Sequence, residues 1–230
     1  GRVSNVNAIT LHATDDIEIE QSLLLTKSNS GVDVESTSAG IVIGPKVKIK
    51  AGGSTFTAAG NIEIGSRAKL QIFAFNHLEW DFITPGALAS EDLDIKGGSE
   101  LRLQVGSLEV GGKFKLNPSR VYLTATGAVR IGRMLQKDGE VHVTASSIEI
   151  GIPDAKGKVR SSKLKTTEDV QMSATGDIRM DGVKIIAPTS FSGPDAIDLD
   201  AGGDLSFVDG TIRSRPSQPR DVMLTAGGGF

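Results

Sequence analysis

The sequence contains no cysteine among its 230 residues. Disulfide bonds, thiolate metal sites and a catalytic cysteine are therefore excluded. Aromatic residues make up only 4%, with one Trp and one Tyr, although a compact globule of this size normally anchors its core with more large rings. No apolar run approaches the roughly 18 residues that a membrane-spanning helix needs, so we expect no membrane span.

A strong excess of one charge is also missing. The chain has 25 Lys and Arg against 28 Asp and Glu, a net charge of −3. Nucleic-acid-binding domains usually carry a basic footprint, so no nucleic-acid partner is predicted. The three histidines stand far apart in sequence, and no His/Asp/Glu group has the spacing of metal ligands. We predict no catalytic residue, no metal site and no cofactor, and we expect that the chain is not an enzyme.

What the sequence does have is a repeat of short alternating segments. An apolar-x-apolar segment is followed about eight residues later by a second one, and the pair recurs about every 20 to 29 residues. Clear pairs are 121–123 with 129–131, 141–143 with 148–150, 170–172 with 178–180, and 197–199 with 205–207. Small-residue connectors join the members, such as Thr-Ala-Thr-Gly at 124–127 and Asp-Ala-Gly-Gly at 200–203.

This pattern predicts an all-β chain. Alternation at period two turns one side of each strand inward and the other outward, but strands this short cannot hold a sheet alone. Stacking equivalent strands would pair each with its neighbours and line up Val and Ile in columns. No stretch of 12 residues shows a helical apolar stripe. A β-sandwich would not normally repeat one connector. We therefore predict a β-solenoid of about nine or ten coils.

The connectors suggest a family. Residues 197–205, Ile-Asp-Leu-Asp-Ala-Gly-Gly-Asp-Leu, resemble the repeat of filamentous-haemagglutinin-like adhesins of two-partner secretion systems. Residues 222–230 resemble the start of another copy, and 121–131 and 170–180 are looser versions. The resemblance implies a right-handed parallel β-helix, export by a two-partner pathway, and a rod that carries binding determinants away from the cell.

The expected function is a structural and adhesive rod segment of a bacterial secreted or cell-surface protein with a role in virulence. Its partners would be host-surface or neighbouring-cell glycans or proteins, and the chain is expected to be monomeric. Two alternatives stay open. One is a polysaccharide-degrading enzyme with carboxylates and basic residues on one outer sheet of a parallel β-helix. The other is a trimeric phage or secretion-system spike, because residues 9–19 are similar to such spikes.

We expect one β-solenoid domain over residues 1–230, cut from a longer protein, with three interruptions. The first is an irregular excursion at 67–90, where four of the ten aromatic residues fall within 73–82. On one interpretation His77 and Trp80 contact a sugar or a protein from a lateral ledge, since exposed loops on rigid scaffolds often carry function. On the other, which we prefer, Phe73, Phe75 and Phe82 fill one wide coil and Trp80 lies over it.

The other interruptions are loops at 153–165 and 213–220. The first is basic, and its Lys156, Lys158 and Arg160 could contact a heparin-like chain or a phosphate group. A solvated loop without a ligand is the preferred interpretation. The second contains Pro216 and Pro219. Proline lacks the backbone donor that a sheet needs, so this segment is expected to leave the sheet as a surface loop.

Overall fold

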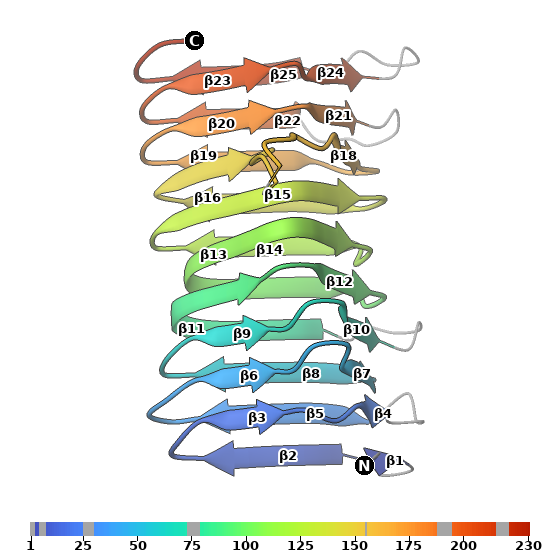
Figure 1. The fold of residues 1–230 in the computed structure, drawn as a ribbon. Coiled ribbons are helices and arrows are strands. Elements are labelled where there is room, and N and C mark those ends of the chain that lie inside the picture. Colours follow the sequence, from blue (N-terminus) through green and yellow to red (C-terminus); the bar gives the residue numbers. More distant parts are fainter. Residues whose placement is uncertain are drawn as a thin grey trace.

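The computed structural model describes residues 3–4, 8–24, 30–72, 79–154, 156–187, 195–214 and 221–230. These residues form 25 strands joined by turns and loops, and none of them is helical. No helix long and apolar enough to cross a membrane is therefore present among them. Figure 1 shows the strands stacked into a column, with the N-terminal coil at one end and the C-terminal coil at the other. The predicted all-β solenoid is confirmed.

The strands lie on three faces around one core, and every pairing on each face is parallel. Face 1 comprises β2 (Ala8–Ala13), β5 (Gly31–Ser36), β8 (Gly53–Ala58), the first part of β11 (Glu79–Ser90), the first part of β13 (Glu100–Leu116), β14 (Arg120–Ala125), β16 (Glu140–Ala145), β19 (Val170–Ala174), β22 (Asp195–Ala201) and β25 (Asp221–Ala226).

Face 2 comprises β3 (Ile17–Ile19), β6 (Ile41–Ile43), β9 (Ile62–Ile64), the second part of β11, the middle of β13, the first part of β15 (Ala128–Gln136), β17 (Ser147–Ile150), β20 (Ile178–Asp181) and β23 (Leu205–Val208). Face 3 comprises β1 (Val3–Ser4), β4 (Leu23–Leu24), β7 (Lys48–Ala51), β10 (Ala68–Ile72), β12 (Leu93–Lys96), the ends of β13 and β15, β18 (Ser162–Lys165), β21 (Val183–Ala187) and β24 (Thr211–Ser214).

One passage through the three faces makes one coil, and the described strands make about nine coils. In Figure 1 the nearer strands β3, β6 and β9 run to the right, while the fainter β2, β5 and β8 run to the left behind them. Because the chain rises from the N-terminus to the C-terminus, this winding is right-handed, which is the hand of nearly all parallel crossover connections.

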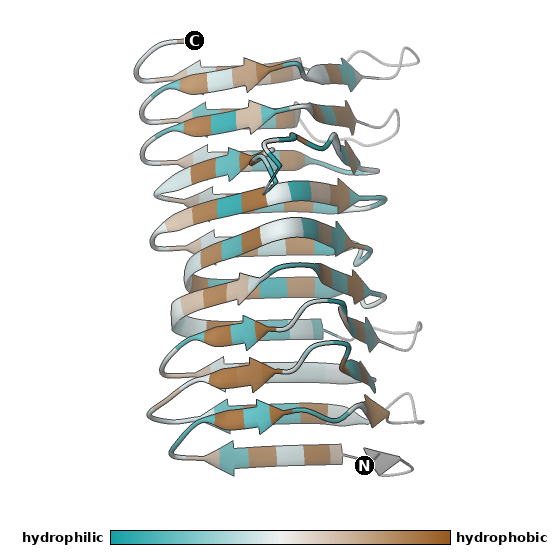
Figure 2. Cartoon of the chain, in the orientation of Figure 1, coloured by the Kyte–Doolittle hydropathy of each residue, from teal (hydrophilic) through white to brown (hydrophobic). Residues whose placement is uncertain are grey.

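The core is a set of aliphatic columns that run along the axis. Val121, Val141, Val170 and Ile197 occupy successive coils in direct register, and each is fully buried. Figure 2 shows the same alternation as brown and teal bands along the strands. β-Branched residues suit this arrangement because they pack well on a pleated surface. Burying one such side chain stabilises the fold by about 1.5–3 kcal/mol.

The small-residue connectors form the corner between face 1 and face 2. The carboxylate of Asp177 accepts a hydrogen bond from the Asp204 amide one coil further on, at 2.8 Å, and Asp204 binds the Gly229 amide in the same way, at 2.8 Å. The backbones approach closely here, since a Cβ on Gly202 would lie 2.2 Å from the Thr175 carbonyl oxygen. The recurring Ala-Gly-Gly letters therefore reflect stacked corners with no room for a side chain.

The described residues of 67–90, where we predicted an irregular excursion, are mostly regular strand. Residues 68–72 form β10 on face 3, and 79–90 form β11, which pairs with β8, β9 and β13. The alternation of Trp80, Phe82 and Thr84, all buried, sends every second side chain into the core. Residues 73–78, which include Phe73 and Phe75, lie outside the described part of the chain.

The two predicted loops are shorter than expected where the structure describes them. Residues 162–165 belong to β18, so the first loop occupies 152–161. The strand forms because Leu164 follows Gln136 in register and is fully buried, whereas the flanking lysines face outward. Residues 213–214 belong to β24, and 215–220, with both prolines, lie outside the described residues.

Candidate functional site

Two predicted contact residues do not form a described surface site. His77 lies outside the described residues. Trp80 is fully buried and points into the core, so its ring is not offered to a partner and does not lie over the core either. The reason is local space: its register partner on β8 is Ser54, whose small side chain leaves room for the indole.

Trp80 belongs to a buried aromatic stack that spans two coils. Its ring centroid lies 6.1 Å from that of Phe56 and 6.2 Å from that of Phe82, and the interplanar angles are 10° and 12°. Aromatic pairs at such distances stabilise the fold beyond the area that they bury. Trp80 and Phe82 are therefore part of the core packing.

The three basic residues of the other predicted site lie on the exposed loop 152–161, which is organised around Asp154. The Asp154 Oδ1 accepts hydrogen bonds from the amides of Lys156 (2.9 Å) and Lys158 (3.1 Å). Its Oδ2 lies 3.2 Å from Nη2 of Arg160. These backbone hydrogen bonds, above all the one from Lys158, hold the pKa of the Asp154 carboxyl below its ordinary value.

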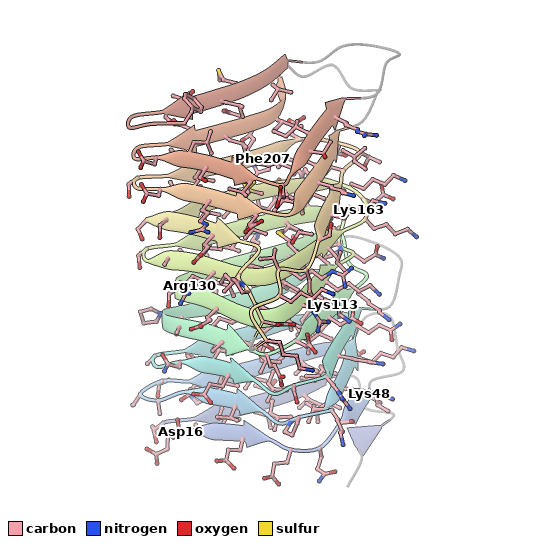
Figure 3. The ribbon with its side chains drawn as sticks, turned by 45° about the horizontal axis from the view of Figure 1, so that its top comes forward. Asp16, Lys48, Lys113, Arg130, Lys163 and Phe207 are labelled. Carbon is pink, nitrogen blue, oxygen red and sulfur yellow. The ribbon has the colours of Figure 1, made fainter. Side chains whose placement is uncertain are left out.

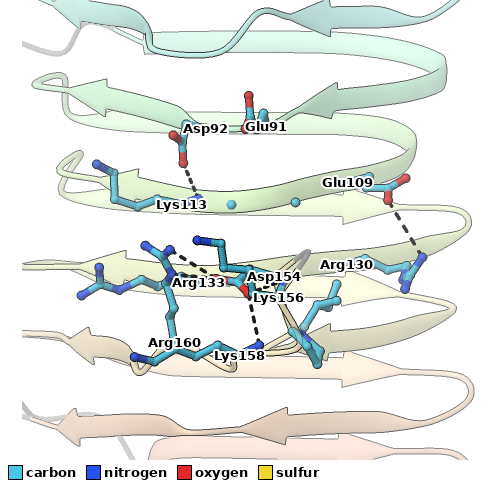
Figure 4. A pocket seen from close by; sticks show the side chains of 15 residues that line it. Glu91, Asp92, Glu109, Lys113, Arg130, Arg133, Asp154, Lys156, Lys158 and Arg160 are labelled. Atoms are coloured by element: carbon cyan, nitrogen blue, oxygen red, sulfur yellow. Dashed lines mark hydrogen bonds and ion pairs between the residues drawn. The ribbon is translucent and has the colours of Figure 1, made fainter.

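A surface hollow of about 660 Å³ opens beside this loop, between it and strands β13 and β15 (Figure 4). Arg133 ties the loop to β15, because its Nε donates to the Ser161 carbonyl at 3.0 Å. The hollow is lined by charged groups of both signs: Glu91, Asp92, Glu109, Asp154, Lys113, Arg130, Arg133, Lys156, Lys158 and Arg160. The structure thus gathers the predicted Lys156, Lys158 and Arg160 at one hollow of mixed charge, where the acidic side chains of the same hollow partly balance the basic ones.

A second group of titratable side chains lies on the outside of face 1. In one column Glu79, Glu100, Arg120 and Glu140 stack in register, and in the next Asp81, Arg102, Tyr122 and His142 do so. We call these eight residues the face 1 ladder. Arg102 pairs with Glu79 at 3.2 Å and also with Glu100. The Tyr122 hydroxyl donates to Glu140, and the Tyr122 and His142 rings meet edge to face at 5.2 Å.

The ladder shifts several pKa values. Partial burial, followed by the nearby Glu79, raises the pKa of Asp81. Burial and the hydrogen bond to Glu140 raise the pKa of Tyr122 to about 12. Burial also raises the pKa of Glu168, and a hydrogen bond between the Glu168 and Glu140 carboxyls adds to the effect. Two carboxyls in direct hydrogen bond share a proton, whereas two-carboxylate glycosidases hold theirs about 5–9.5 Å apart.

Sequence reasoning missed the ladder. A signal for the ladder was present in the outward-facing residues of the predicted strands, since Tyr122 and His142 occupy the middle of 121–123 and 141–143. Register, which the sequence leaves open, is what brings them together. Among the described residues, no three His, Cys, Asp or Glu side chains are grouped so that they could hold a metal ion.

No protein family, no curated protein and no solved structure matches this chain. The resemblance to filamentous-haemagglutinin-like repeats stays a prediction from the residues of the connectors.

Proposed function

We propose that this chain is a structural rod segment of a bacterial secreted or cell-surface protein, which holds binding surfaces away from the cell. The observation that carries the proposal is the continuous register of the three faces through all described coils. A column whose neighbours contact only each other can be lengthened coil by coil. The Ala-Gly-Gly corners, which resemble those of filamentous-haemagglutinin-like adhesins, support the bacterial surface assignment.

A rod made of equivalent coils should tolerate the loss of one whole coil. Deleting residues 121–140 joins Arg120 to Val141, and these two positions continue the existing register because Val121 pairs with Val141. We expect a folded protein with an unchanged β-sheet circular dichroism spectrum and a length shorter by about 4.8 Å. Deleting 121–130 is the matched control, which should fail to fold because it leaves an incomplete coil.

The surface assignment has its own test. Antibodies against this chain should label intact producing bacteria or the culture supernatant. Labelling that appears only after lysis would overturn the assignment. Adherence of host cells to the immobilised chain, relative to immobilised albumin, tests the adhesive part of the proposal.

A polysaccharide-degrading enzyme is the second candidate, favoured by the acids, Tyr122 and His142 of the face 1 ladder. The ladder pairs its carboxylates with arginines, and the Glu140 and Glu168 carboxyls contact each other directly, which suits a structural role better. Incubation with a broad panel of glycans decides between the two: release of reducing or unsaturated ends that stops in Glu140→Gln would establish the enzyme.

A further inference from the structure

The outside of face 3 is strongly basic. Eight strands, from β7 to β24, offer sixteen outward positions on this face, and eleven of these are Lys or Arg while one, Asp94, is acidic. We call these eleven residues the lysine face. They are Lys48, Lys50, Lys69, Lys96, Lys113, Lys115, Arg133, Lys163, Lys165, Lys184 and Arg213. Figure 3 shows Lys48, Lys113 and Lys163 projecting from the same side of the column.

The other faces do not share this bias. On face 2, for example, Arg130 lies between Glu109 at 4.0 Å and Glu149 at 3.3 Å, so opposite charges alternate along the axis. Although the net charge is only −3, the basic residues are therefore concentrated on face 3. A surface lined by one sign of charge attracts counter-ions and steers charged partners towards itself.

The register places like charges next to each other on the lysine face. Lys48 pairs directly with Lys69, and Lys163 pairs directly with Lys184. Like charges in direct register destabilise a sheet. An anionic partner lying on the face would relieve this repulsion, so the arrangement is better suited to a bound than to a free state.

Two hollows run along this face. One, of about 360 Å³, is lined by Lys46, Lys48, Arg67, Lys69 and Lys113, with Asp92 and Asp94 at its side. The other, of about 410 Å³, is lined by Lys96, Lys115, Lys137, Lys163 and Lys165. The first hollow extends from β7 to β13 and the second from β12 to β18, so the two hollows follow one another along the solenoid axis.

The dimensions and chemistry of the lysine face indicate its partner. Its outward positions fall in three register columns about 6.6 Å apart, a strip about 13 Å wide, which suits a single polymer chain better than a duplex or a membrane surface. Its sixteen outward positions include no aromatic ring, so it lacks the stacking platforms that single-stranded nucleic acids use. Lysine ammonium groups act as point charges without the bidentate fork of arginine, which suits spaced carboxylate or sulfate groups.

We propose that the lysine face binds a linear anionic polysaccharide laid along the solenoid axis. The coil spacing of about 4.8 Å offers the polymer a fresh row of positive charge at each step. The inference goes beyond the proposed rod function, because a rod with an inert lysine face would still be a rod.

The test compares two triple variants of the 230-residue chain with the same change in net charge. Lys69→Gln, Lys115→Gln and Lys163→Gln neutralise the lysine face, whereas Lys156→Gln, Lys158→Gln and Arg160→Gln neutralise the loop. Calorimetric titration uses polygalacturonate and chondroitin sulfate as probes, with neutral dextran as the blank. Circular dichroism checks that both variants fold.

We expect the lysine-face variant to bind about tenfold or more weakly, as three exposed ion pairs would allow, with a shallower dependence of affinity on salt. The loop variant should stay within about twofold of the parent chain. Equal losses in both variants, or no binding of either probe, would overturn the proposal. Tighter binding of duplex DNA or of phosphatidylserine vesicles at equal charge concentration would overturn it in favour of that partner. The binding test and the coil-deletion test are independent, so the lysine-face proposal can fail while the proposed rod function stands.

Discussion

The rings of Phe56 and Phe82 lie one coil apart in direct register, with centroids 5.0 Å apart and planes within 8° of parallel. Both are fully buried, and the indole of Trp80 extends the stack. Elsewhere the columns consist mainly of aliphatic residues. This stack is thus a local thickening of the core. The preferred interpretation of the sequence placed Phe82 in the core but laid Trp80 over it.

Replacement of Phe82 by Ala should destabilise the protein strongly. Truncating a buried Phe leaves a cavity and typically costs about 3–5 kcal/mol. Ile83→Ala is the matched control on the same strand, since Ile83 is 38% exposed and should change stability by only about 0.5 kcal/mol. Urea unfolding followed by circular dichroism measures both. Similar costs for the two variants would contradict the inward placement of Phe82.

Gly139 should not accept a side chain. Its φ is +79°, and an added Cβ would lie 1.7 Å from the Ser119 carbonyl oxygen of the coil below. Gly157 is the matched control, with φ of +72° and open space around it. Gly157→Ala should cost only the roughly 1–2 kcal/mol of left-handed backbone strain. Gly139→Ala should cost clearly more in thermal unfolding; an equal cost would mean that the coils are not so closely stacked.

Stability should fall as pH rises through the raised pKa of Glu168. The folded protein holds this proton more tightly than the unfolded chain does, whose value is near 4.5. The stabilising effect is therefore complete below the unfolded pKa and is lost above the folded one. Glu168→Gln keeps a hydrogen-bond donor towards Glu140 but cannot titrate.

The variant should match the parent at low pH and exceed it at neutral pH by less than about 1 kcal/mol, because the group is half-exposed. Urea midpoints from pH 3 to pH 8 measure the difference. A constant offset across that range would show that Glu168 titrates normally.

Asp154 should control the order of the basic loop. Asp154→Ala removes the acceptor of the Lys156 and Lys158 amides, whereas Asp154→Asn retains an acceptor oxygen and loses only the charge that faces Arg160. Trypsin should therefore cut after Lys156, Lys158 or Arg160 fastest in the Ala variant, with the Asn variant intermediate. Unchanged cleavage rates in both would mean that the loop is ordered by other contacts.

The sequence predicted the solenoid because local alternation and the small corner residues both depend on near neighbours. The alternating segments that begin at Val121 and Val129, for example, predict the strands of face 1 and face 2 in one coil. The segment 47–49 was recognised as an alternating strand, but a third strand in every coil was not, although 113–115 and 163–165 also alternate. Lysines at the outward positions of 163–165 made this segment look like part of a solvated loop.

Two other features could not be obtained from the sequence. The room for the Trp80 indole in the core depends on the small size of Ser54, which lies 26 residues earlier and becomes a neighbour only through the register. The segregation of charge likewise depends on which residues share a face. The total charge of −3 gave no sign that Lys48, Lys69 and Lys184 lie on one side of the column.

Distances between paired spin labels test the central claim, the parallel stacking of coils in one register. The chain has no cysteine, so introduced cysteines can be labelled uniquely. The outward ladder that begins at Glu35 passes through Thr124, Thr144, Ser173 and Asp200, which are four, five, six and seven coils further on.

With one label at position 35 and the second at each of these positions in turn, double electron–electron resonance should give distances that rise by about 4.8 Å per coil. The step should be equal from 124 to 144 and from 144 to 173, although these separations differ by nine residues. Distances that follow sequence separation, or that do not increase along the series, would contradict the solenoid.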